Sequence, residues 1–156
     1  MPVFISHRTQ DDSRATLIAL RLERQGVPTY QDHFDPTLDR ARHITAKLVA
    51  AIRGCTHLMA LVTEATRESW WVPFEIGVAR EAPRRIATYQ SSVSALPEYL
   101  EEWPVLRSDG DLDRFAAAYH KDAASEPSGD MLKAAFRTIQ SADDFHRELK
   151  AALGQR

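Results

Sequence analysis

The feature that most constrains the fold of this chain is an alternation of short apolar runs with segments of helical periodicity. The apolar runs are rich in β-branched and large aliphatic residues, and we predict strands over residues 3–5, 27–32, 57–63 and 86–89. Between these runs, apolar residues recur at spacings of three and four, which is typical of helices. Because parallel strands need a crossover that a helix supplies, this alternation predicts an α/β fold with a flavodoxin-like, doubly wound parallel sheet.

Glycine and proline mark the expected ends of the helices. We expect one helix to start at Ser13 and end at Gly26, a second to end at Gly54, and a third to end at Ala82-Pro83. In the third helix, Pro73 is predicted at the first helical position, which proline tolerates well.

The pattern is weaker after Gln90. There we expect a short helix over 96–103, an edge strand over 104–106, a helix over 112–119 capped by Asp111, and a mobile loop over 123–130. A final amphipathic helix is expected over 142–153. We therefore predict a main domain over residues 1–121 and a C-terminal extension, including this added helix, packed on the same domain over 122–156.

Composition limits the class of protein further. The chain has 156 residues, 20 Lys and Arg against 22 Asp and Glu, and a formal charge of −2, so we expect one domain and no nucleic-acid partner. The single Cys55 excludes an intramolecular disulfide, and no Cys/His cluster has metal-site spacing. No leader precedes Val3 and no apolar run approaches the roughly 20 residues that cross a bilayer, so we expect a cytoplasmic protein without membrane contact.

Three polar loops follow the first three predicted strands. In open α/β sheets, ligands bind beyond the carboxyl ends of the strands, where such loops converge. A carboxylate beside tryptophans, cationic side chains and a hydroxyl group is suited to a nucleotide. The candidate residues in these loops are Ser6, His7, Arg8, Asp35, Arg40, Arg42, Ser69, Trp71 and Glu75.

Two interpretations of Glu75 stay open at this stage. It lies in the apolar stretch 70–78, and carboxylates in apolar surroundings are catalytic candidates. With Pro73 at the first helical position, Glu75 would instead lie in the first turn, where the helix dipole stabilises a carboxylate. Trp70 and Trp71 have the same ambiguity, since large aromatic side chains are usually part of the core and only one of the two needs to face a ligand.

Two further residues are poor candidates for nucleophilic catalysis. Neighbouring side chains on a strand point in opposite directions, so Ser6 and His7 are not expected to form a catalytic couple. Cys55 lies between a helix end and an apolar strand, which indicates a small buried thiol rather than a nucleophile.

Three motifs of the chain are Phe4-Ile5-Ser6-His7, the pair Asp11-Asp12, and Ser69-x-Trp71-Val72-x-x-Glu75. Together they resemble the motifs of a Toll/interleukin-1 receptor (TIR) domain, especially of its bacterial members. The resemblance covers about residues 3–120. It implies a flavodoxin-like sheet with a long loop after the second strand. It also implies cleavage of NAD at the nicotinamide glycosidic bond, as in many bacterial and plant members. Some of these cyclise the ADP-ribose product into a signal used in anti-phage defence, as in Thoeris systems.

The resemblance also implies roles for individual residues. Glu75 matches the catalytic glutamate of the family, and Trp71 matches the tryptophan that packs near the nicotinamide ribose. Ser6, His7 and Arg8 match the loop that lines the nucleotide pocket, and an arginine such as Arg8, Arg40 or Arg42 would pair with the pyrophosphate.

NAD would be the substrate, and no cofactor is implied. The implied protein partners are further copies of the chain, through TIR–TIR contacts, and a separate effector protein that senses the product. Two other functions remain open: a noncatalytic TIR adaptor that acts through self-association, and an enzyme similar to nucleoside deoxyribosyltransferases, which also use a glutamate on a similar sheet.

Overall fold

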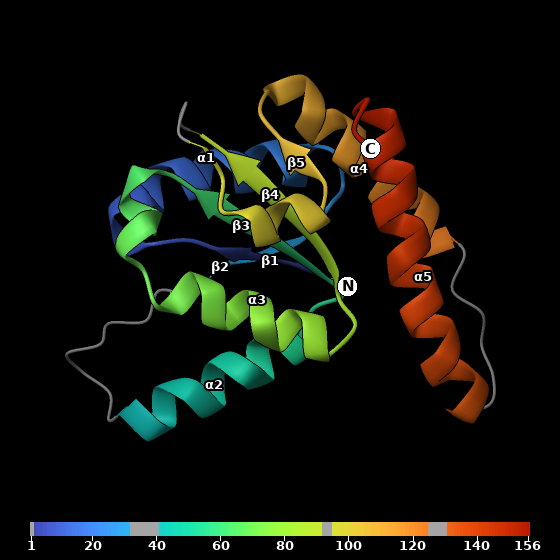
Figure 1. Cartoon of the computed structure of the whole chain (residues 1–156), viewed down its shortest axis with the longest axis horizontal. Helices are drawn as coiled ribbons and strands as arrows, with labels where there is room; N and C mark the ends of the chain where they lie inside the picture. Colours follow the sequence, from blue (N-terminus) through green and yellow to red (C-terminus); the bar gives the residue numbers. More distant parts are fainter. Residues whose placement is uncertain (1, 32–40, 92–94, 125–130) are drawn as a thin grey trace.

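The computed structural model describes residues 2–31, 41–91, 95–124 and 131–156. Five parallel strands form one sheet in the order β2-β1-β3-β4-β5 (Figure 1). This strand order confirms the predicted flavodoxin-like, doubly wound sheet. The strands are β1 (Val3–Ser6), β2 (Thr29–Gln31), β3 (His57–Val62), β4 (Arg85–Gln90) and β5 (Val105–Leu106).

Helices cover both faces of this sheet. Short 3₁₀ turns lie in three of the connections and are η1 (Thr9–Asp11), η2 (Glu64–Glu68) and η3 (Glu98–Glu102). The α-helices are α1 (Asp12–Arg24), α2 (Ala41–Gly54), α3 (Trp71–Glu81), α4 (Asp109–Ala124) and α5 (Met131–Ala152). In the described part of the chain, no helix combines the length and the apolar character needed to cross a membrane.

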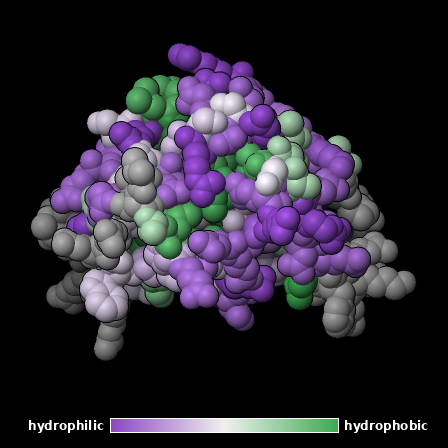
Figure 2. All heavy atoms as spheres, turned by 45° about the horizontal axis from the view of Figure 1, so that its top comes forward, coloured by the Kyte–Doolittle hydropathy of each residue, from purple (hydrophilic) through white to green (hydrophobic). Residues whose placement is uncertain are grey.

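The sheet separates two cores because successive strand side chains point to opposite faces. Ile5 and Met59 pack with α1, α4 and α5, whereas Phe4 and Leu58 pack with α2 and α3. Every residue of β3 is buried, which confirms the prediction of a central strand there. On the face shown in Figure 2, hydrophilic residues cover most of the surface and hydrophobic ones form small separate patches.

Several helix boundaries differ from the sequence prediction. Gly26, with a φ of 76°, follows the end of α1 as expected. However, α3 already begins at Trp71, so Pro73 is not its first residue. The last helix begins at Met131 rather than at residue 142, and α4 continues to Ala124, into the predicted loop. The rest of that loop, residues 125–130, lies outside the described residues.

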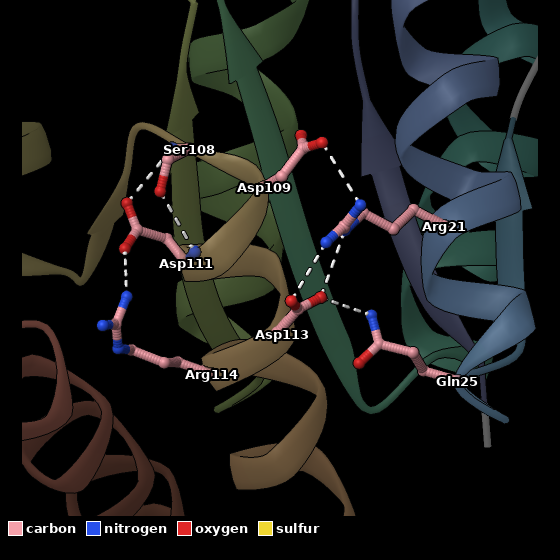
Figure 3. Close-up of polar contacts among 7 residues, drawn as sticks. All are labelled: Arg21, Gln25, Ser108, Asp109, Asp111, Asp113 and Arg114. Carbon is pink, nitrogen blue, oxygen red and sulfur yellow. Dashed lines mark hydrogen bonds and ion pairs between the residues drawn. The ribbon is translucent and has the colours of Figure 1, made fainter.

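The start of α4 is also earlier than predicted, and Asp111 has a different role there. The Asp111 N–H donates to Ser108 Oγ at 3.2 Å, and the Ser108 N–H donates to Asp111 Oδ2 at 3.1 Å. Ser108 therefore precedes the helix, and Asp111 reaches back to it in a reciprocal capping arrangement. Figure 3 shows this pair beside Arg21 of α1, which forms ion pairs with Asp109 and Asp113 and so links α1 to α4.

Helix α5 completes the sheet as well as the core. Phe145 and Leu149 of α5 belong to the core on the sheet face that α1 and α4 cover. The N–H of Ile86 points from β4 towards the side on which β5 pairs, but β5 begins further along and does not reach it. His146 Nε2 accepts the hydrogen bond of this N–H at 2.8 Å. The imidazole thus satisfies a buried backbone donor for which β5 is too short.

Candidate active site beside β1 and β3

The strand order has its switch point at the carboxyl ends of β1 and β3. The chain leaves β1 through α1 on one face of the sheet and returns from β2 through α2 on the other. The connections on either side of this point diverge, and ligands of open α/β sheets bind at such a switch point. The loops after β1 and β3 meet at this switch point.

Ser6 and Glu75 meet at this edge. Ser6 ends β1 and lies beside Ala60 of β3, and its side chain points to the face covered by α2 and α3. Its hydroxyl donates a hydrogen bond to Glu75 Oε2 of α3. Ser6 is 1% exposed and Glu75 is 7% exposed, so the contact is shielded from water. The fold therefore joins two residues 69 positions apart into one buried carboxylate–hydroxyl pair.

The position of Glu75 on its helix removes one of the two interpretations of this residue. Since α3 begins at Trp71, Glu75 is past the first turn, which holds no acidic residue. The helix dipole acts mainly within the first turn and does not explain a buried carboxylate here. A buried carboxylate at a ligand-binding edge is a recognised mark of a functional site, and the catalytic role of Glu75 stays a prediction.

Aromatic side chains border this carboxylate on the outside. Trp71 precedes Glu75 by one helical turn, so both lie on the same side of α3. Trp71 is 44% exposed and stands edge-on to Phe74, with ring centroids 6.1 Å apart. Trp70 is 91% exposed, so neither tryptophan is part of the core, contrary to the usual behaviour of large aromatic residues.

The loop after β1 is fastened to the loop after β3. The Arg8 guanidinium donates to the carbonyl oxygen of Ala65, and Thr63 Oγ1 donates to Asp11 Oδ2 at 2.8 Å. Sequence analysis did not select Thr63, because its partner lies 52 positions away and nothing local marks the contact. These contacts hold the two loops together at the switch point.

The neighbouring candidates have separate partners. His7 Nδ1 donates to the carbonyl oxygen of Ile5 at 3.0 Å, and its Nε2 lies 3.0 Å from Asp12 Oδ1. The Ser6 hydroxyl contacts Glu75, and the expectation that Ser6 and His7 form no catalytic couple stays a prediction. Ser69 Oγ accepts a hydrogen bond from the Val72 N–H at 3.3 Å and so supports the start of α3.

The remaining candidates belong to the segment after β2. Asp35 and Arg40 lie outside the described residues. Arg42 belongs to α2, but its side chain is also outside the described part of the structure. Their predicted contacts with substrate stay predictions.

The thiol of Cys55 is buried at a distance from this switch point, before the start of β3. Burial raises the pKa of the Cys55 thiol to about 11, which keeps it protonated and inert, as expected from the sequence. Within the described ranges, no cluster of His, Cys, Asp and Glu is arranged to hold a metal ion.

The open parallel sheet with helices on both faces defines a flavodoxin-like α/β domain, with a buried carboxylate at its switch point. A family model described as "TIR domain" matches residues 3–150, so the chain belongs to the TIR domain family. This match confirms the resemblance seen in the sequence and extends it through most of α5.

A likeness to a solved structure supports the same fold. A CMP N-glycosidase from Clostridium botulinum matches with a TM-score of 0.57 and 16% sequence identity, over 75% of this chain and 98% of that one. At this identity the likeness shows a shared fold. Among curated protein sequences, none matches the chain significantly.

Proposed function

We propose that this chain is an NAD glycohydrolase that cleaves the bond between nicotinamide and ribose, with Glu75 as the catalytic residue. The observation that carries the proposal is the buried Glu75 carboxylate, held by the Ser6 hydroxyl at the β1–β3 switch point. Membership of the TIR family supports it. The shared fold with a protein described as an N-glycosidase of a nucleotide adds support for cleavage of an N-glycosidic bond.

The leaving group explains why one carboxylate is sufficient. In NAD the nicotinamide ring carries a positive charge, so it takes the electron pair of the breaking C–N bond and departs as a neutral molecule. No strong general acid is needed, and positive charge develops on the anomeric carbon instead. A carboxylate fixed beside that carbon stabilises the transition state electrostatically or through the ribose hydroxyls. Water then bonds to the anomeric carbon and loses a proton to solvent.

The other candidates bind and orient the substrate in this proposal. Trp71 packs against the ribose and excludes water, while Ser6 holds the carboxylate in position. The pyrophosphate pairs with arginines of the bordering loops, and a guanidinium binds a phosphate through two parallel hydrogen bonds. These arginines are Arg8, Arg40 and Arg42, with His7, Asp35 and Ser69 as further polar contacts.

We further propose a signalling role for the product. Linear or cyclised ADP-ribose would diffuse to a separate effector protein in bacterial anti-phage immunity of the Thoeris type, within the cytoplasm. Self-association through TIR–TIR contacts would complete or activate the site. Mass spectrometry of the product made at high protein concentration distinguishes a hydrolase from an ADP-ribosyl cyclase.

The direct test measures nicotinamide release from NAD by chromatography at several protein concentrations. Glu75→Gln keeps the shape of the side chain but removes its charge, and we expect release to fall about a hundredfold or more. Glu81→Gln is the matched control, because Glu81 is an exposed residue of the same helix. Equal activity in both variants, or no release by the unmodified protein at any concentration, contradicts the proposal.

The fold likeness favours one alternative substrate class, nucleoside monophosphates. Incubation with CMP and detection of free cytosine tests it, and deoxyribose transfer between bases tests the related transferase activity. A chain that only self-associates, and cleaves none of these substrates, would be an adaptor.

A further inference from the structure

A cavity lies along the edge strand β5. Its volume is about 400 Å³, within the usual range for small-molecule sites. Its walls come from the end of β4, the segment leading into η3, β5 itself and the C-terminal end of α5, and none comes from β1, η2 or α3. The lining residues are Gln90, Ala95, Leu96, Glu101, Val105, Arg107, Lys150, Gln155 and Arg156.

The charge of this lining is unbalanced. Three cationic side chains face one acidic side chain, Glu101. Arg107 forms no ion pair with another residue of the described ranges. By contrast, Arg21 on the surface of α1 and the buried Arg85 of β4 each have a carboxylate partner. Arg107 therefore brings to the cavity a positive charge that no carboxylate of the described residues neutralises.

Amide and main-chain oxygen atoms hold two of these cations in place. Arg107 Nε donates to Gln90 Oε1 at 3.0 Å, an arrangement that leaves both Nη groups of the guanidinium for another acceptor. Lys150 Nζ donates to the main-chain oxygens of Glu101 at 2.8 Å and of Arg156, the last residue, at 3.2 Å. The neutral amide oxygen of Gln90 orients the Arg107 guanidinium without cancelling its charge, so this group is preorganised for an anion.

The floor of the cavity is also fixed. Gln155 Oε1 accepts a hydrogen bond from the Val105 N–H at 2.9 Å, and Gln155 Nε2 donates to the Val105 carbonyl oxygen. This side chain occupies the open edge of β5 as a further strand would, and it ties the end of α5 to the sheet. The segment that carries Lys150 is thereby kept next to Arg107 without a ligand.

We infer that this cavity binds a small phosphate-bearing molecule at a site separate from the candidate active site. The planar Arg107 guanidinium suits two oxygens of one phosphate, and Lys150 supplies a point charge for a second group. Leu96 and Val105 provide apolar lining for the uncharged part of the ligand. The inference does not depend on whether the chain cleaves NAD.

Titration calorimetry with pyrophosphate at low ionic strength tests this site. Arg107→Gln is expected to weaken binding about tenfold or more, because a preorganised charge-assisted contact is lost. Arg24→Gln is the matched control: it removes the same charge from an exposed residue at the end of α1 and should change affinity less than about twofold. An equal loss in both variants would show that net charge alone attracts the anion and would overturn the proposal.

Backbone amide spectra of isotopically labelled protein then locate the bound pyrophosphate. We expect shifts around Gln90, Arg107 and Lys150 that disappear in Arg107→Gln, while the remaining signals show that this variant stays folded. Shifts confined to the region of Ser6 and Glu75, or no binding at millimolar pyrophosphate, would refute the second site.

Discussion

The two ends of the sheet bury polar side chains in opposite ways. At the amino ends of β3 and β4, Arg85 Nε lies 2.9 Å from Asp122 Oδ2, and Ser141 Oγ donates to the same carboxylate. His57 lies 3.7 Å from Asp122 and packs against the aromatic ring of Phe145. At the carboxyl ends, Ser6 holds Glu75 beside partly exposed aromatic residues.

The difference shows how burial and function are related in this fold. Asp122 is a residue of α4, and it contacts Arg85 of β4 and Ser141 of α5. Its charge therefore helps to hold α4 and α5 against the sheet. Glu75 is equally shielded but lies at the edge where loops meet, next to side chains that solvent and ligands reach. A carboxylate is chemically useful in the second setting and structural in the first.

The largest expected effect tests the structural end of this comparison. Asp122→Asn leaves the Arg85 guanidinium buried without its charged partner, and we expect a loss of about 3–5 kcal/mol in the free energy of unfolding. Urea denaturation followed by circular dichroism measures it. Glu148→Gln, which breaks the exposed pair with Lys121, is the control and should cost under about 1 kcal/mol. Similar small losses in both variants would remove the distinction between the two ends.

The next effect concerns pH and the same end of the molecule. Burial lowers the pKa of His146 to about 4, from an ordinary value of 6.5. Between these values the unfolded chain binds more protons than the folded one, so stability is full above pH 6.5 and falls as the pH drops towards 4. We expect a loss of about 2 kcal/mol between pH 7 and pH 5 from this group.

His146→Gln isolates that contribution, because the amide oxygen can still accept the Ile86 N–H but does not titrate. Its stability should depend less steeply on pH in this window. An unchanged slope in His146→Gln would show that the imidazole is not buried in its neutral form.

The smallest effect concerns the carboxyl ends of the strands, where Ser6 contacts Glu75. Ser6→Ala removes the hydroxyl that holds Glu75, and we expect kcat for NAD cleavage to fall about tenfold with little change in KM. Ser6→Thr keeps a hydroxyl at this position and should restore much of the activity. A change confined to KM would assign Ser6 to substrate binding, as the sequence suggested, rather than to positioning of Glu75.

Local patterns predicted most of the fold correctly. The apolar run of β3 and the Gly26 end of α1 were recognisable because side-chain periodicity and backbone conformation are local properties. The predicted start of α3 is wrong, since proline is compatible with more than one position in the first turn and Pro73 is not the first residue of the helix. The cap of α4 was also assigned to the wrong residue, because Ser108 and Asp111 act as a pair.

The sequence by itself determined the class of fold and drew attention to Glu75. The periodic spacing of apolar residues that distinguishes strands from helices can be recognised within short segments of the chain. Only the tertiary structure decided that Glu75 is buried, that Ser6 holds it, and that Arg107 and Lys150 share a cavity. Each of these facts depends on elements distant in the chain packing together, and burial, charge balance and hydrogen bonding arise from that packing.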